Sequence, residues 1–262
     1  MSRSLPLHLS EIGLQRMRPS PVLQPFIEWF WAICPDQYVR EQHHELMHSQ
    51  GGLGLLFNWG DKLESTYGHY QPSVSLESVQ LCSRKITLTG NIQAFGILFR
   101  PGGAFPFFDI PMHELTCVDQ LQSRHLSLLH DQLADIPTFA GKVRRTESWL
   151  TSLLHQDYRQ LFTVPALLKL INDHQGQLSI QQIARRSYLS ERKLERIFKQ
   201  KVGISPKKYS RLVRLHQVRT VLKQSTLTLA DISHLTGFYD QAHFNREFMK
   251  IVGMTPGEYL SR

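Results

Sequence analysis

The C-terminal part of this 262-residue chain contains the same pattern twice, and the repeat constrains the fold more than any other feature of the sequence. The first copy spans residues 178–209 and the second spans residues 227–259. Equivalent residues lie 49 positions apart before an internal turn, as Ile183 and Ile232 do, and 50 positions apart after it. A repeat of this regularity, with one extra turn residue in the second copy, predicts that both copies fold as the same small unit.

Each copy carries the signals of two helices separated by a short turn. Ser179 is followed three residues later by Gln182, and Thr228 by Asp231, which is the spacing of a capping box at a helix start. Further signals occupy equivalent places: Ser190 and Asp240 as caps of the second helix, Gly203 and Gly253 as left-handed stops, and Pro206 and Pro256 as first residues of the next helix. The pattern therefore predicts two helix-turn-helix units.

One long helix is predicted to join the two units. The segment from Pro206 to Gln224 has 19 residues and contains no Gly and no Pro after its first residue. A helix of this length spans about 28 Å. Two units held at that distance can address major-groove segments about 34 Å apart, which is one turn of B-DNA.

The basic charge of the chain is concentrated in the same region. Residues 161–262 hold 17 Lys and Arg against 7 Asp and Glu, whereas residues 1–160 hold 13 against 15. All four Trp lie in the first 160 residues. A strongly basic domain beside a near-neutral, aromatic-rich one is typical of a protein that binds a polyanion through one part only. Excess charge that serves only solubility is the competing interpretation.

The second helix of each unit carries a polar stripe suited to reading base edges, because this helix enters the major groove in helix-turn-helix proteins. Arg bonds guanine, Glu accepts from cytosine, Asn and Gln bond adenine, and Ala contacts the thymine methyl. The predicted base-reading residues are Arg192, Glu195 and Arg196 in the first unit and Gln241, Ala242, Asn245 and Arg246 in the second. An ordinary solvated helix face is the alternative.

Further basic and hydroxyl side chains are predicted to contact the DNA backbone, which sets register and salt dependence but carries no sequence information. These residues are Ser190, Lys193, Lys199, Lys207, Lys208, Arg211 and Lys250, with Arg214 and Lys223 as additional candidates on the joining helix.

The first part of the chain carries strand signals. Short apolar runs between Leu53 and Phe108 are bounded by turn residues such as Gly, Asn and Pro. The segments 53–57 and 93–100 are predicted strands. A small, largely antiparallel β domain is therefore expected.

Two helices are predicted to follow the strands. Apolar residues recur at helical spacing over 121–133 and over 139–154. Their apolar faces either cover the β domain or pair with a second copy of the chain. The predicted fold class is α+β, with a β-rich sensory or dimerisation domain and following helices over 1–160, and an all-α DNA-binding domain of two helix-turn-helix units over 161–262.

One motif suggests a different function. His44-Glu45-x-x-His48 has the spacing with which two imidazoles on one helix hold zinc while the Glu acts as general base. A metal-dependent enzyme fused to a DNA-targeting domain is therefore the alternative hypothesis. Gly51, Gly52 and Gly54 follow at once, where the motif needs a continuing helix, and no third ligand is evident. We expect no catalytic residues, no metal, no cofactor and no enzymatic activity.

The remaining features favour the cytoplasm. Cys34, Cys82 and Cys117 are odd in number and far apart, so they form neither a disulfide framework nor a zinc ribbon. Met1 to Arg18 lacks the apolar core of a signal peptide. No run approaches the ~18 apolar residues of a membrane span.

The repeats resemble the DNA-binding domain of the AraC/XylS family of bacterial transcription regulators. The resemblance covers Val164 to Arg262, and its most specific stretch is Gly237-Phe238, Phe244-x-Arg246-x-Phe248 and Gly253-x-Thr255-Pro256-x-x-Tyr259. It implies seven helices and sequence-specific binding that activates or represses promoters, and by position it assigns base reading to the residues named above. Asp240 stands where Ser is usual and Met249 where Lys is usual. The difference at Met249 removes an expected phosphate contact, so the second unit is expected to bind DNA more weakly than the first.

The first part also resembles a regulator-associated domain, through Pro21 to Trp31 and Phe95 to Gly103. This resemblance implies sensing or dimerisation. Trp31, Trp59, Phe105 and Phe108 either line an effector pocket or fill the core. The implied partners are double-stranded promoter DNA, RNA polymerase, a small-molecule effector at the N-terminal domain and a second copy of the chain, with the protein on the nucleoid and no membrane contact.

Overall fold

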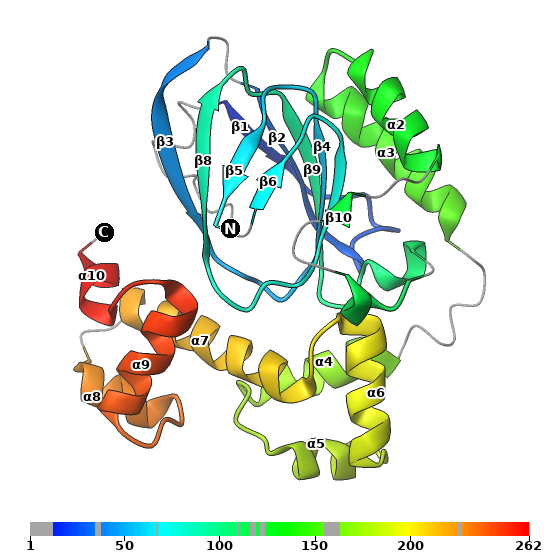
Figure 1. Cartoon of the computed structure of the whole chain (residues 1–262). Coiled ribbons are helices and arrows are strands. Elements are labelled where there is room, and N and C mark those ends of the chain that lie inside the picture. Colours follow the sequence, from blue (N-terminus) through cyan, green and yellow to red (C-terminus); the bar gives the residue numbers. More distant parts are fainter. Residues whose placement is uncertain are drawn as a thin grey trace.

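The computed structural model describes residues 13–34, 38–66, 68–108, 110–115, 119–120, 124–154, 163–224 and 227–261. Within these residues the chain forms a β-rich domain, two helices beside it and an all-helical C-terminal domain (Figure 1). The predicted α+β fold class is confirmed. The predicted domain boundary near residue 160 falls in 155–162, outside the described residues.

Two antiparallel sheets pack face to face in the N-terminal domain. The first sheet has the strand order β1-β2-β9-β4-β7-β10 and the second has the order β3-β8-β5-β6. The first contains β1 (Leu14–Met17), β2 (Ile27–Ile33), β4 (Gly54–Asn58), β7 (Val74–Glu77), β9 (Ala94–Phe99) and β10 (Asp119–Gln120). The second contains β3 (Val39–Met47), β5 (Leu63–Ser65), β6 (Gly68–Tyr70) and β8 (Arg84–Gly90).

The central strands follow the two segments predicted as strands. Leu55 and Phe57 of β4 lie opposite Ile97 and Phe95 of β9. All four side chains are buried in the core shared with α2 and α3, and Leu56, on the opposite face of β4, is buried in the core shared with the second sheet. Strands buried on both faces read as continuous apolar runs, which explains why these two segments lack a clear polar alternation.

The helices α2 (Arg124–Ala134) and α3 (Phe139–Leu153) cover the outer face of the first sheet (Figure 1). Leu129 and Leu133 of α2 and Val143 and Leu150 of α3 are buried in one core with the strands. Thr138 caps α3 by accepting a hydrogen bond from the Gly141 N–H. Of the two predicted uses for these apolar faces, the structure shows packing within the chain.

The C-terminal domain contains seven helices within the described residues, as the resemblance implied. They are α4 (Thr163–Asp173), α5 (Ile180–Arg186), α6 (Glu191–Val202), α7 (Pro206–Gln224), α8 (Leu229–Leu235), α9 (Gln241–Val252) and α10 (Pro256–Leu260). The joining helix α7 has the predicted bounds. Two short 3-10 helices of the N-terminal domain, η1 (Phe105–Phe107) and η2 (Met112–Glu114), lie between the sheets and this domain.

The predicted caps are present in both units. Ser179 with Gln182 and Thr228 with Asp231 form reciprocal capping boxes. Ser190 and Asp240 accept hydrogen bonds from the third backbone N–H of α6 and α9, and Gly203 and Gly253 end these helices in the left-handed conformation. Local sequence therefore determines where each of these helices starts and stops.

The one-residue difference between the repeats lies in the turn of the second unit. Tyr188 and Gly237 hold equivalent places and both have positive φ, of 55° and 75°. Leu189 and Phe238 follow, and the second unit then inserts Tyr239 before its cap. The backbone turn is thus the same in both units, and the extra residue is an exposed tyrosine.

The metal-enzyme alternative fails on geometry, because His44 and Glu45 lie in strand β3 and not on a helix. Four residues of extended chain span about 13 Å, so His44 and His48 cannot grip one ion as two histidines one helical turn apart do. The His44 ring bonds Thr87 Oγ1 at 3.2 Å and the His48 ring bonds Ser83 Oγ at 2.7 Å. Both imidazoles join strands or loops of the second sheet.

Other sequence features have simple structural counterparts. Cys34 and Cys82 are free thiols, and Cys117 lies outside the described residues, as do residues 1–12. Among the helices of the described segments, none combines the length and apolarity that crossing a membrane requires.

Candidate DNA-binding surface

The second helices of the two units, α6 and α9, present the same pattern of buried and exposed residues. Leu194 and Phe198 of α6 and their equivalents Phe244 and Phe248 of α9 are fully buried. The residues between them alternate identically between half-buried and exposed in both helices. Each helix therefore has one face in the core and one polar face in solvent, as two groove-reading helices need.

On α6 the predicted base-reading residues share one exposed face. Arg192 and Arg196 are exposed and Glu195 is half-buried. They line a shallow hollow with exposed Lys199 and with His113 of η2. This face carries a net positive charge and donors that suit guanine edges and phosphates.

On α9 the predicted residues are less uniformly available. Gln241, Ala242 and Arg246 are exposed. Asn245 is half-buried, and its Oδ1 is buried without a hydrogen-bond partner among the described residues. Asn245 Oδ1 can therefore accept a hydrogen bond from a base edge only after the side chain rotates.

The lysines predicted to contact the DNA backbone are exposed. They are Lys193 and Lys199 on α6, Lys207 and Lys208 at the start of α7, and Lys250 on α9. Ser190 Oγ accepts a hydrogen bond from the Lys193 N–H at 3.2 Å, so this hydroxyl acts as the cap of α6. Lys193 and Lys199 line the same hollow as Arg192 and Arg196.

The arginines and the last lysine of α7 are engaged within the protein. The Arg211 guanidinium forms an ion pair with Glu247 of α9. Arg214 lies 5.6 Å from the centre of the Phe238 ring, and burial lowers its pKa. Lys223 Nζ lies 5.1 Å from the centre of the Tyr259 ring. These side chains hold α7 against the second unit, a role that the sequence analysis did not assign to them.

Two exposed tyrosines beside α6 and α9 were not predicted from the sequence. Tyr188 is 97% exposed and Tyr239 is 87% exposed, and each lies within two residues of the cap of α6 or α9. Exposed aromatic side chains at this place have no packing role. The change in repeat offset was the signal that could have identified Tyr239.

A second candidate site is a cavity of about 190 Å³ between the two sheets. Its wall is mainly apolar, with Trp31 among its members. The other three aromatics proposed for a pocket lie elsewhere: Trp59 stacks on His130, Phe105 lies under Lys201, and Phe108 packs on Phe99 in the core. The prediction of aromatic lining residues therefore holds for Trp31 alone.

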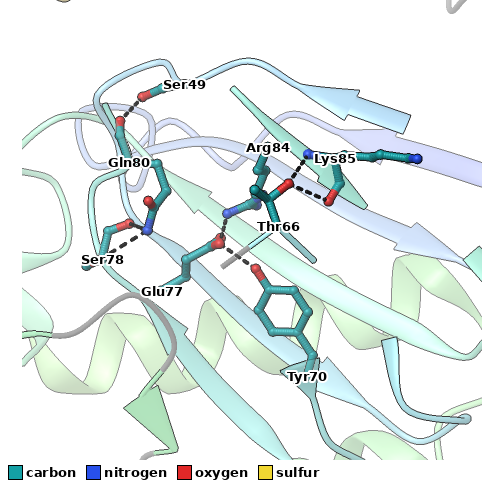
Figure 2. Close-up of polar contacts among 8 residues, drawn as sticks. All are labelled: Ser49, Thr66, Tyr70, Glu77, Ser78, Gln80, Arg84 and Lys85. Carbon is teal, nitrogen blue, oxygen red and sulfur yellow. Dashed lines mark hydrogen bonds and ion pairs between the residues drawn. The ribbon is translucent and has the colours of Figure 1, made fainter. Parts of the chain in front are cut away.

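Tyr70, Glu77 and Arg84 form a polar part of the cavity wall. Figure 2 shows the contacts among these three side chains. Glu77 is 6% exposed and forms an ion pair with Arg84. The Tyr70 hydroxyl donates to Glu77 Oε1 at 2.5 Å. The pair is neutral as a whole, because one carboxylate faces one guanidinium.

Two family models match the chain. One, described as a helix-turn-helix domain, covers residues 183–262, and the other, described as a domain of unknown function (DUF6597), covers residues 15–119. The C-terminal domain is of the AraC type. The N-terminal match agrees with the β-rich domain described above.

Named relatives share parts of this chain. The uncharacterized HTH-type transcriptional regulator YtdP of Bacillus subtilis is 27% identical over an alignment of 159 residues. The alignment covers 56% of this chain and 20% of YtdP. The HTH-type transcriptional activator RhaR of Yersinia pseudotuberculosis is 35% identical over 77 residues, 29% of this chain and 27% of RhaR. The chain thus spans about a quarter of the curated relatives it matches.

A solved structure is also similar to part of this chain. The transcriptional regulator with an AraC-type DNA-binding domain from Chromobacterium violaceum is 28% identical, with a TM-score of 0.38. The match covers 40% of this chain and 95% of that one.

The AraC-type domain keeps the local structure at its two unusual positions. Asp240 accepts a hydrogen bond from the His243 N–H at 2.6 Å, so the carboxylate caps α9 as a serine would. Met249 is 48% exposed on α9. Of these two positions, Met249 is therefore the one where an exposed cation is missing.

Proposed function

We propose that this chain is a sequence-specific DNA-binding transcription regulator that reads two adjacent major-groove segments, one with α6 and one with α9. The observation that carries this proposal is the identical exposure pattern of the two helices in a basic, repeated AraC-type domain. A helix of 19 residues joins the two units and spans about 28 Å, close to the ~34 Å turn of B-DNA.

In this proposal one set of residues contacts base edges and another contacts phosphates. Base edges are read by Arg192, Glu195 and Arg196 on α6 and by Gln241, Ala242, Asn245 and Arg246 on α9. Phosphates are contacted by Lys193, Lys199, Lys207, Lys208 and Lys250. We leave Arg211 out of this second group because its guanidinium pairs with Glu247.

The partners follow from the same proposal. The ligand of the reading faces is double-stranded promoter DNA in the cytoplasm, and RNA polymerase and a second copy of the chain are the protein partners. The cavity between the sheets is the proposed effector site, since its wall is apolar with a few buried polar groups, as small-molecule sites are. No step of this function is catalytic.

Selection of random duplexes by the purified full-length protein at about 150 mM salt tests the proposal. We expect a recovered site with two short boxes whose centres lie about 10 base pairs apart. Recovery of DNA without sequence preference, in spite of binding, would make the chain a general DNA binder. A single box would leave only one of the two helices as a reader.

A further inference from the structure

Two loops of the N-terminal domain lie between the cavity and the DNA-binding domain. We name residues 48–52 and 78–83 the bridging loops. Ser49 Oγ donates to the Gln80 carbonyl (Figure 2), and His48 Nδ1 bonds Ser83 Oγ at 2.7 Å. The loops are thus tied to one another and can move as one unit.

One side of the bridging loops forms part of the cavity wall. The residues that line the cavity from these loops are His48, Ser49, Gln50, Gly52, Ser78, Gln80 and Cys82. Any molecule that fills the cavity therefore lies against the bridging loops.

The other side of the bridging loops holds the second helix-turn-helix unit and α7. His216 Nε2 on α7 donates to the Ser49 carbonyl at 2.8 Å. The Ser83 N–H donates to the Ile251 carbonyl at 2.6 Å. Ile251 is in the last turn of α9, where carbonyls have no partner within the helix, so the N-terminal domain caps the end of the second reading helix.

Aromatic and apolar contacts extend this attachment. The His48 ring lies 5.9 Å from the Tyr259 ring of α10, nearly edge to face. Leu46, Val79 and Leu81 pack against the core of the helical domain. The bridging loops therefore couple to α7, α9 and α10 through backbone bonds and packing together.

The first unit is held at other places. Gly203 at the end of α6 packs against Met112 of η2, and Lys201 lies over the Phe105 ring. Neither Met112 nor Phe105 lines the cavity. A change in the cavity thus reaches α9 directly through the bond between Ser83 and Ile251. It reaches α6 only through α7, because Gly51 lies beside Tyr209, whose ring packs on Phe198 of α6.

The wall of the cavity indicates the class of molecule that fits. A volume of about 190 Å³ exceeds the ~150 Å³ of a cavity that holds benzene. Of the charged residues in the wall, Arg16 and Arg84 balance Glu45 and Glu77. An apolar, charge-balanced wall favours an uncharged molecule with few polar groups.

We propose that the cavity binds a small, uncharged, mainly apolar molecule about the size of one or two fused aromatic rings, and that binding changes recognition by α9 more than recognition by α6. The coupling rests on the proposed function, because it is expressed as DNA recognition. Its physical basis is the shared wall: filling the cavity moves the loops that cap α9 and anchor α7.

The test uses the full chain, indole as the probe, and two substitutions at Leu56. Leu56 is buried between the sheets and lines the cavity. Leu56→Trp adds as many heavy atoms as benzene has and so fills the space, whereas Leu56→Met keeps the volume and is the matched control. Calorimetry measures indole binding, and duplexes with one selected box scrambled measure recognition by each helix separately.

We expect indole, and Leu56→Trp without indole, to change affinity for the second box by at least about fivefold and for the first box by less than about twofold. Leu56→Met should behave as the wild type does. Equal changes at both boxes, or no change once indole is bound, would overturn the coupling. Absence of indole binding by the wild type would overturn the assigned ligand class.

Amide hydrogen exchange separates this proposal from the proposed function, because it needs no DNA. Saturation with indole should alter exchange in the last turn of α9 and in α10 while α6 stays unchanged. If Leu56→Trp does not fold, this measurement and the indole titration of the wild type test the coupling between the cavity and α9. A wild type that binds selected and random duplexes equally would refute the proposed function. The exchange measurement would still test whether indole in the cavity affects α9.

Discussion

The ion pair between Arg211 and Glu247 gives opposite expectations for two cations of α7 that the sequence assigns to the same role. Lys208 is exposed, whereas Arg211 ties α7 to α9. Arg211→Met should therefore reduce stability and leave the salt dependence of DNA binding nearly unchanged. Lys208→Met should leave stability unchanged and reduce the slope of log K against log salt by about 1.

The size of the stability loss follows from burial. The side chains of Arg211 and Glu247 are 30% and 21% exposed, between a surface pair and a buried one. Exposed pairs contribute about 0.2–1 kcal/mol, and loss of one partner from a buried pair costs about 3–5 kcal/mol. We expect a loss of about 1–2 kcal/mol for Arg211→Met. Glu247→Gln should cost more, about 2–3 kcal/mol, because it leaves Arg211 and nearby Arg214 without their carboxylate.

Urea denaturation of the three variants and of the wild type measures the free energy of unfolding. Fluorescence anisotropy with the selected duplex from about 50 to 200 mM salt measures the slope of log K against log salt. Far-ultraviolet circular dichroism confirms that each variant is folded before titration. The reasoning is refuted if Arg211→Met lowers the salt slope by about 1 without loss of stability.

Two further predictions concern helix ends. Gly203→Ala should destabilise the protein more than Gly253→Ala. Both residues have positive φ, but an added Cβ meets the Met112 carbonyl oxygen at 3.1 Å at Gly203 and nothing within 4 Å at Gly253. A lower melting temperature for Gly253→Ala than for Gly203→Ala would contradict the packing of η2 on α6. Hydrogen bonds from Thr228 lower the pKa of Asp231 below its usual 3.8, so this carboxylate stabilises the fold above that pH and the contribution is lost as pH falls through the lowered pKa. The melting-temperature gap between wild type and Asp231→Asn should therefore be present at pH 7 and close in acid, and a gap that is independent of pH would show that the carboxylate charge plays no part.

Local signals of the sequence predicted most of the helical domain. The capping boxes at Ser179 and Thr228 and the stop at Gly253 act within one helical turn, so the residues that determine them are neighbours in the sequence. The bounds of α7 follow for the same reason, from Pro206 and the absence of breakers after it.

Contacts between distant segments could not be predicted in this way. The bond between His216 and the Ser49 carbonyl joins residues 167 positions apart, and nothing near either residue signals the other. The pairing of Arg211 with Glu247 likewise depends on how α7 packs against α9. The sequence left Trp59 and Phe108 as either pocket-lining or core residues, because which aromatic lines the cavity depends on how the two sheets face each other.

The most direct test of the proposal that α6 and α9 each read one groove segment is to repeat the DNA selection with Arg192→Ala and Arg246→Ala. Both arginines are exposed on their helices, so neither change should affect folding. Each variant should lose sequence preference in one box only, a different box for each, with a loss of about 1–3 kcal/mol for the wild-type site. Loss of the same box in both variants, or equal weakening on selected and random DNA, would contradict the account.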